Sequence, residues 1–319
     1  MSFPHDAGDF VDLLRVVAGE RGLTEALVEK DYWVTHTLWS LSQSRLDVWF
    51  KGGTSLSKGF GLITRFSEDL DLKIDRGHLD ALPLVKSWTS KNPGPTASRR
   101  AFYEALGTVL SVPGARVELD PESPGKEART AEYKVLYPGQ FLGQLAPPMR
   151  PFILLEVGHA RVLPYVERPI DSWTHDALQT RNLLSEYSEN RPRAVRCVHP
   201  LVTLLDKLDA ISSRFSRGKE APSFVRHYED AARIIQAADG GRLAAITGDA
   251  RGLGHDMFAE RDIRALPSAA DPAFTLAAGD RGDEIARAYQ SIAPMFWGPR
   301  VPLDEALTLV RDWVARTFG

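Results

Sequence analysis

The sequence predicts an α+β protein in which a mixed sheet comes first and a mainly helical part follows. Two stretches indicate strands: apolar and polar residues alternate over residues 70–74, and residues 152–158 form an apolar run around one glutamate. Helically spaced apolar residues dominate the last third of the chain. We therefore expect residues 1–190 to hold the sheet together with N-terminal helices, and residues 191–319 to form a helical domain.

The composition is that of a globular protein in a reducing compartment. The 319 residues are 43% hydrophobic and 25% charged, and Cys197 is the single cysteine, which excludes a zinc site built from several cysteines. No apolar run approaches the ~20 residues that cross a bilayer, and the N-terminus lacks a secretion-signal pattern. These features predict a cytoplasmic protein without a membrane partner. The net charge of −3 gives no overall attraction to nucleic acid.

Periodicity and turn residues predict the other elements. Helices are expected at 6–20, at 25–42 with Thr24 as its cap, at 79–88, at 99–109, from 200, from 224, at 283–293 and at 303–317. Strands are expected at 47–50, 115–119 and 133–137. Loops or mixed connectors are expected at 91–98, 160–190 and 237–254.

The most informative stretch of the chain is residues 51–74, KGGTSLSKGFGLITRFSEDLDLKI. Gly52 and Gly53 allow a tight turn and a close approach of the backbone to a ligand. Thr54 and Ser55 fall where a helix should begin, and the unpaired amides of a helix N-terminus bind phosphate. The short helix is expected to turn its apolar residues inward: Leu56, Phe60 and Ile63.

Two aspartates follow this turn on the predicted strand. Asp69 and Asp71 are two residues apart, so both side chains leave the same face, with Cα atoms roughly 6.5–7 Å apart. Both carboxylates can then reach one Mg²⁺, or flank two ions about 3.5–4 Å apart. A solvated strand is the alternative explanation. A phosphate-binding turn next to paired carboxylates favours metal-assisted phosphoryl or nucleotidyl transfer.

GGTSLSK followed by RFSEDLDL resembles the DNA polymerase β-like nucleotidyltransferase superfamily and, more narrowly, the AbiEii/MenT family of bacterial toxins. Other family-like patterns follow in order: EKDYWVT before the turn, DKLDA around Lys207 and RHYED ending at Asp230. The resemblance implies a polymerase β-like fold whose helical domain closes the active-site cleft. It also implies a toxin of a toxin–antitoxin system that uses Mg²⁺ to add NMP from NTP to the 3′ end of tRNA. Translation would stop, and a cognate antitoxin would neutralise the protein.

The resemblance implies roles for individual residues. Asp69 and Asp71 would hold Mg²⁺, and Lys207 would neutralise nucleotide phosphates with Asp230 as its partner across the cleft. Glu156, inside the apolar strand, would be a third metal ligand; alternatively it faces solvent or pairs with a basic residue such as Arg161. The residues implied to bind the triphosphate are Gly52, Gly53, Thr54, Ser55 and Lys58.

A regulatory position is also implied. Ser67, two residues before Asp69, matches a family position beside the active site. A phosphate on Ser67 would add negative charge among carboxylates and should oppose metal and nucleotide binding.

Several charged residues have simpler explanations. The triplet 29–31 (Glu, Lys, Asp) is expected on an exposed helical face, and His227 is expected to be a structural histidine rather than a proton carrier. Residues 191–219 contain seven basic and two acidic residues. Together with Arg99 and Arg100, this segment is expected to follow the phosphates of an RNA acceptor stem.

Two other functions stay open. One is a nucleotidyltransferase that modifies a protein or a small molecule such as an aminoglycoside. The other is a non-catalytic nucleotide-binding protein on the same frame. A degenerate copy usually loses some of its functional residues, so the full set argues against the second alternative: Asp69, Asp71, Lys207 and Asp230.

Overall fold

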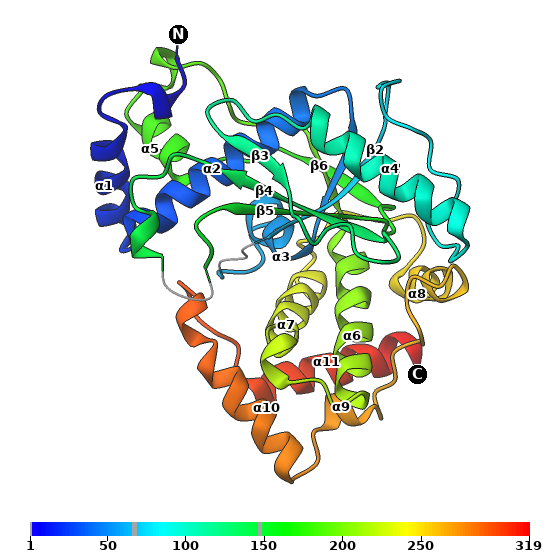
Figure 1. Cartoon of the computed structure of the whole chain (residues 1–319). Coiled ribbons are helices and arrows are strands. Elements are labelled where there is room, and N and C mark those ends of the chain that lie inside the picture. Colours follow the sequence, from blue (N-terminus) through cyan, green and yellow to red (C-terminus); the bar gives the residue numbers. More distant parts are fainter. Residues whose placement is uncertain (1, 66–68, 146–148) are drawn as a thin grey trace. The chain divides into compact units, whose positions relative to one another are not determined.

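The computed structural model describes residues 2–65, 69–145 and 149–319 (Figure 1). Contacts divide the chain into two compact units. Unit 1 comprises Met1–Gly59, Ser67–His159 and Glu167–Cys197. Unit 2 comprises Phe60–Phe66, Ala160–Val166 and Val198–Gly319. Two short stretches that precede residue 191 thus belong to the helical unit. The predicted boundary at residue 191 stays a prediction.

A mixed sheet forms the frame of unit 1. In the described chain it has seven strands, in the order β3-β4-β5-β2-β1-β7-β6. The bounds are β1 Asp47–Lys51, β2 Asp69–Asp75, β3 Arg116–Leu119, β4 Thr130–Leu136, β5 Ile153–Gly158, β6 Tyr165–Arg168 and β7 Val195–Val198. β2 pairs antiparallel with β1 and parallel with β5, so it lies within the sheet rather than at an edge. The predicted α+β class is confirmed.

The alternation predicted for β2 decides which face of the sheet is apolar. Leu70, Leu72 and Ile74 are at most 1% exposed, whereas the residues between them are half-buried. The in-register neighbours of Leu72 on either side, Phe50 and Val157, are buried as well. One face of the sheet is therefore core, and the other carries the polar residues of β2.

Helices flank this sheet in unit 1. Their bounds are α1 Phe10–Arg21, α2 Glu25–Gln43, α3 Gly52–Thr54, α4 Pro93–Val109 and α5 Trp173–Thr180, with 3₁₀ turns at Pro4–Asp6, Leu142–Gln144 and Leu184–Glu186. α2 contacts α1, α5 and β5, and α4 contacts β3 (Figure 1). Thr24 caps α2 as predicted, since its side chain accepts a hydrogen bond from the Leu27 amide at 3.4 Å.

Some predicted elements are wrong. Residues 79–88 form no helix: Pro83 interrupts them, and Leu84 is 71% exposed although Leu82 is buried. α4 begins at Pro93 inside the predicted loop, because proline suits the first turn of a helix. β6 and α5 lie inside the predicted connector 160–190, and α8 begins inside the predicted loop 237–254. β7 lies in the segment that was expected to open the helical domain.

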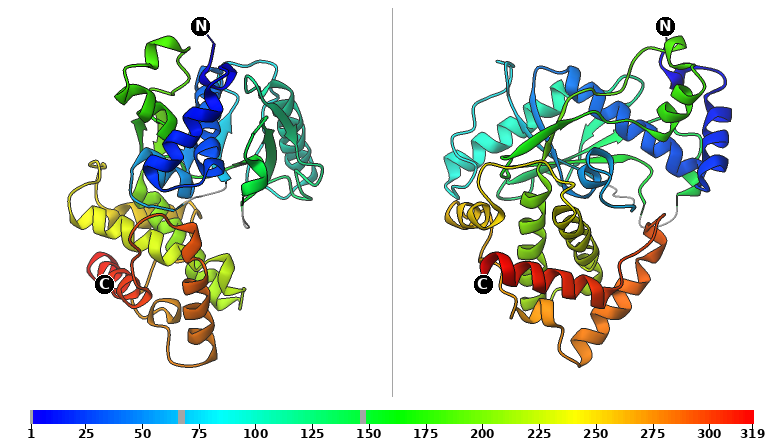
Figure 2. Two further views of the ribbon diagram at one scale, coloured as in Figure 1. Left: turned by 90° about the vertical axis from the view of Figure 1, so that its left-hand side faces the viewer. Right: turned by 180° about the vertical axis from the view of Figure 1, so that it is seen from behind.

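Unit 2 is helical. Its bounds are α6 Pro200–Ser216, α7 Arg226–Asp239, α8 Ala250–Ala259, α9 Pro272–Thr275, α10 Asp280–Ser291 and α11 Leu303–Phe318, with 3₁₀ turns at Ala221–Ser223 and Ala293–Met295. α7 packs against both α6 and α11, and α11 runs across the other two helices (Figure 2). Among the described residues, no helix combines the length and the apolar character that a membrane span requires.

A buried polar network ties α2 to α5 in unit 1. His36 is 0% and His175 2% exposed. Asn190 joins them: its Oδ1 lies 2.7 Å from His175 Nε2, and its Nδ2 donates to His36 Nδ1 at 3.0 Å and to the Tyr32 hydroxyl at 2.9 Å. Burial lowers the pKa of both His36 and His175 to about 4.

We expect this network to make unit 1 sensitive to acid. Between the unfolded pKa of about 6.5 and the folded value near 4, only the unfolded histidines bind protons. As the pH is lowered through this range, the free energy of unfolding should therefore fall by up to about 1.4 kcal/mol per pH unit for each histidine. Urea unfolding between pH 7 and pH 4.5 measures this slope.

Two variants isolate the contribution of one histidine. His175→Gln should give a smaller pH slope than the wild type. Ser172→Ala removes the hydroxyl that lies 2.7 Å from His175 Nδ1 but no titrating group. It should lower stability while leaving the slope unchanged. A wild-type slope in His175→Gln would contradict this account.

Candidate active site

Gly52 follows β1 directly and lies against the polar face of β2. Its φ is +74°, a conformation that favours glycine, and a Cβ on Gly52 would lie 1.7 Å from Oδ2 of Asp71. Lys51, one residue earlier, is the in-register neighbour of Asp71 across the two strands. The turn therefore places the backbone directly against one of the predicted metal ligands.

The short helix after this turn differs from its prediction. α3 continues as a π-helical turn, Ser55–Gly59, and ends there, so Phe60 and Ile63 lie beyond it. Thr54 is 4% exposed, and its hydroxyl donates to the Asp69 carbonyl oxygen at 2.8 Å. Ser55 is 2% exposed. The Thr54 hydroxyl thus joins α3 to β2, and the predicted triphosphate contacts of this turn stay a prediction.

Glu156 lies beside the aspartate pair. β5 runs parallel to β2, with Glu156 in register with Asp71 and Leu154 in register with Asp69. On its other side Glu156 is in register with Glu132 of β4. Burial raises the pKa of Glu156 to about 7, and the charge of Asp71 adds to this effect. The sheet therefore gathers acidic side chains at one place on its polar face.

The alternative partner of Glu156 is engaged elsewhere. Within unit 2, the Arg161 guanidinium lies 2.8 Å from Glu260 and 3.4 Å from Asp262. Arg161 also donates to the Leu163 carbonyl oxygen at 2.9 Å. The pairing of Glu156 with Arg161 is therefore not observed.

The chemistry of this acidic group fits a hard divalent cation. Three neighbouring carboxylates, from Asp69, Asp71 and Glu156, offer the oxygen ligands that Mg²⁺ prefers. The raised pKa of Glu156 reflects burial and like charge, and a bound cation relieves the like-charge component. Among the described residues, no three His, Cys, Asp or Glu side chains already converge as a preformed metal site. Metal binding by these three residues stays a prediction.

The charged triplet of α2 is buried, so the prediction of an exposed face is wrong. Glu29, Lys30 and Asp31 are 1%, 0% and 5% exposed. Asp31 forms an ion pair with Lys58 and accepts from the Trp173 amide at 2.9 Å. The Lys58 ammonium, predicted to bind the triphosphate, is therefore held by Asp31. The sequence did contain a feature that could have indicated this burial. The triplet lies inside an otherwise apolar helix, next to two aromatic residues.

Unit 2 contains a buried ionic cluster built around Asp230 of α7. Arg65 donates to both carboxylate oxygens of Asp230 at 2.8 and 2.7 Å, and Lys207 of α6 donates to Oδ2 at 2.7 Å. Asp230 is 0% and Arg65 2% exposed. Burial alone would raise the pKa of Asp230, but the two cations outweigh burial and lower it.

The structure thus brings Lys207 and Asp230 together, while their roles in catalysis stay a prediction. Arg65 is a third member that the sequence did not indicate. His227 lies 3.4 Å from Lys207 through Nδ1 and 3.4 Å from Arg214 through Nε2. Burial and the charge of Lys207 lower the pKa of His227, so it is neutral at pH 7. This agrees with a structural histidine.

Several basic residues expected to contact RNA act inside the protein instead. Arg99 is 0% exposed, and all five of its N–H donors are used. The expected phosphate contact of Arg99 is therefore wrong. Arg100 donates to the Pro124 carbonyl oxygen at 3.1 Å. In the segment 191–219, four of the seven cations pair with carboxylates: Arg191 and Arg193 with Glu189, Arg196 with Asp47, and Lys207 with Asp230.

Ser67 lies outside the described residues. The predicted effect of its phosphorylation stays a prediction.

Comparison with known protein families identifies the family of this chain. The family described as nucleotidyl transferase AbiEii toxin, of the type IV toxin–antitoxin system, matches residues 36–308. A solved structure similar to this chain is MenT4, a nucleotidyltransferase toxin from Mycobacterium tuberculosis H37Rv. The identity is 16% and the TM-score 0.38, with 96% of this chain and 99% of that chain covered. No curated protein matched the sequence. Because the family pattern spans most of its length, the chain belongs to the AbiEii family of nucleotidyl transferase toxins of type IV toxin–antitoxin systems.

Proposed function

We propose that this protein transfers a nucleoside monophosphate from an NTP to the 3′ end of tRNA in a Mg²⁺-dependent reaction. Modified tRNA could not be charged, translation would stop, and a cognate antitoxin would counter the effect. Family membership supports the nucleotidyl transfer and the toxin–antitoxin context. The acceptor and the metal are the added parts of the proposal.

One observation carries the proposal. The glycine turn packs against Asp71 so closely that a Cβ on Gly52 would overlap its carboxylate, and Glu156 is the in-register neighbour of Asp71. A turn that can approach phosphate is thus joined to a group of acidic oxygens. This combination suits binding of a triphosphate together with its divalent cation.

The residues of unit 1 then have defined tasks. Asp69, Asp71 and Glu156 would hold Mg²⁺, which supplies charge stabilisation on the phosphates when bound. The backbone at Gly52 and Gly53 would approach the triphosphate. A carboxylate of the site would accept the proton of the attacking hydroxyl. The acceptor oxygen bonds to the α-phosphorus, the bond to the bridging oxygen breaks, and pyrophosphate leaves.

A smaller acceptor is the second candidate. Several cations expected to track RNA are occupied by partners within their own unit, among them Arg99, Arg191 and Arg196. This favours a protein side chain or a small molecule, which needs fewer phosphate contacts than tRNA.

A labelling assay tests both candidates. Purified protein is incubated with Mg²⁺, each α-labelled NTP in turn, and total tRNA. We expect label in tRNA for the wild type and none for Asp69→Asn. The matched control is Asp75→Asn, which lies on the same strand and pairs with Lys73 at 3.0 Å; it should retain activity.

The outcomes separate the candidates. Label at the tRNA 3′ end supports the proposal and identifies the nucleotide. Label on a protein or a small molecule would show that the acceptor is not tRNA, while the proposed nucleotidyl transfer would stand. If no nucleotide labels any acceptor, and expression without antitoxin leaves growth unchanged, the proposed function is wrong.

A further inference from the structure

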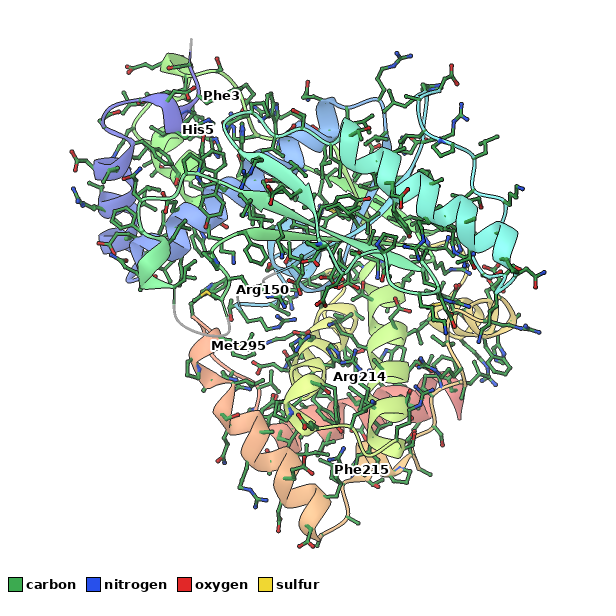
Figure 3. All side chains as sticks on the ribbon, viewed as in Figure 1. Phe3, His5, Arg150, Arg214, Phe215 and Met295 are labelled. Carbon is green, nitrogen blue, oxygen red and sulfur yellow. The ribbon has the colours of Figure 1, made fainter. Side chains whose placement is uncertain are left out.

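One arginine outside the predicted site lies beside one of its carboxylates. Arg150 precedes β5, the strand that carries Glu156, and its Nη1 lies 3.9 Å from Oδ1 of Asp69 (Arg150 is labelled in Figure 3). The Arg150 side chain is 45% exposed and that of Asp69 is 33% exposed. Water and solutes therefore reach both groups. Because solvent reaches both groups, an incoming anion can compete with Asp69 for the guanidinium.

A buried lysine holds the backbone of Arg150. Lys30 of α2 is 0% exposed, and its Nζ donates to the Arg150 carbonyl oxygen at 2.8 Å. Burying an ammonium group is costly unless it is hydrogen-bonded or paired, so this hydrogen bond helps to stabilise Lys30 in its buried position. It fixes the point from which the Arg150 side chain reaches Asp69.

The residues beside Lys30 hold neighbouring segments in the same way. Glu29 accepts hydrogen bonds from the backbone amides of Gln140 and Phe141 at 2.8 and 3.0 Å. Asp31 pairs with Lys58 of the turn after α3. Consecutive residues of one helix thus anchor two cations of unit 1, one on each side of the aspartate strand in sequence.

We propose that Arg150 is a triphosphate-binding residue of the nucleotide site and that Lys30 is the residue that positions it. The inference rests on the proposed function, since it places a substrate contact in that site. Without nucleotide, the guanidinium offsets the negative charge of Asp69. With nucleotide bound, it forms a charge-assisted hydrogen bond to a phosphate oxygen.

Removing the guanidinium should have two opposite effects. The triphosphate loses a cationic partner, so NTP binds more weakly. The carboxylates lose a competing cation, so a divalent metal binds more tightly. A residue that only supported the fold would weaken both, and this difference in sign identifies the role.

The experiment compares Arg150→Ala, Arg150→Lys and a matched control, Arg116→Ala, whose side chain is 73% exposed on β3. Affinity for each of the four NTPs is measured by calorimetry in EDTA, and Mn²⁺ affinity by titration without nucleotide. In Arg150→Ala we expect NTP affinity to fall, and KM to rise, by about 10- to 100-fold. Mn²⁺ affinity should rise, and kcat should change less than KM. Lysine should recover part of the loss, and Arg116→Ala should match the wild type.

Lys30 is tested through its coupling to Arg150. Lys30→Met should raise the KM for NTP, and combining it with Arg150→Ala should add little further loss, because both act through one group. Circular dichroism checks that each variant is folded. If the KM increases of the two single variants multiply in the double variant, Lys30 does not position Arg150.

Each failure has its own signature. If the wild type transfers nucleotide but Arg150→Ala keeps the wild-type KM and NTP affinity, this inference is wrong and the proposed function stands. If the wild type binds NTP through Arg150 but labels no acceptor, the proposed function fails alone. If the wild type binds none of the four NTPs, both fail.

Discussion

Replacing Gly52 by alanine is expected to lower nucleotidyl transfer by about 100-fold or more, because displacing a catalytic group by about 1 Å has an effect of that size. The added Cβ would lie 1.7 Å from Oδ2 of Asp71, so the Asp71 carboxylate must move. We expect β2 to stay folded, because Asp71 lies on its polar face and the buried apolar face is unchanged. Steady-state transfer to the acceptor found in the labelling assay measures the loss.

Gly61→Ala is the matched control for this variant. Gly61 has a φ of +61°, close to the +74° of Gly52, but no neighbour lies within 4 Å of its ideal Cβ position. Both variants carry the backbone strain of a left-handed alanine, about 1–2 kcal/mol. Only Gly52→Ala displaces a carboxylate. Equal activity losses in the two variants would show that strain alone is responsible and would contradict the expected role of the turn.

Replacing Asp230 by asparagine is expected to lower the free energy of unfolding by about 3–5 kcal/mol. The substitution keeps the shape of the side chain but removes the negative charge that lies against the buried Arg65 and Lys207. Their side chains are 3% and 8% exposed, so water cannot replace the carboxylate. Urea unfolding gives the loss, and hydrogen exchange at α6 and α7 shows whether it is confined to unit 2.

The control lies on the same helix. Asp239 ends α7 and pairs with Arg316, with side chains 45% and 52% exposed, so Asp239→Asn should cost less than about 1 kcal/mol. Adding Lys207→Met to Asp230→Asn removes one uncompensated cation and should restore part of the stability. If Asp230→Asn is as stable as Asp239→Asn, the buried cluster does not hold unit 2 together. Any loss of transfer would then point to a direct role in catalysis.

The local parts of the site could be predicted from the sequence. Alternation over residues 70–74 is a property of neighbouring residues, so it places Asp69 and Asp71 on one face without knowledge of the fold. The apolar run of β5 likewise marked Glu156 as unusual. What brings Glu156 beside Asp71 is the parallel pairing of two strands far apart in sequence. Only the resemblance to a known family suggested that pairing in advance.

Charged residues show where sequence reasoning stops. The triplet 29–31 (Glu, Lys, Asp) and Arg99 look solvent-exposed from residue type, yet each is buried with partners far along the chain. Arg65 looks like a surface residue before the aspartate strand, yet it binds Asp230. A charge can be buried when a counter-charge or a carbonyl group from a distant part of the chain lies beside it. The periodicity of a sequence does not identify that partner.

The sequence by itself determined the two faces of β2, the glycine turn and the spacing of the aspartates, since these depend on φ/ψ preferences and on side-chain period. The family resemblance implied the pairing of Lys207 with Asp230. The tertiary structure alone decided the other pairings of cation and carboxylate: Lys58 with Asp31, Arg65 with Asp230, and Arg150 with Asp69. The physical reason is that electrostatic energy depends on distance in space and on burial, and residues far apart in sequence acquire both only when the chain has folded.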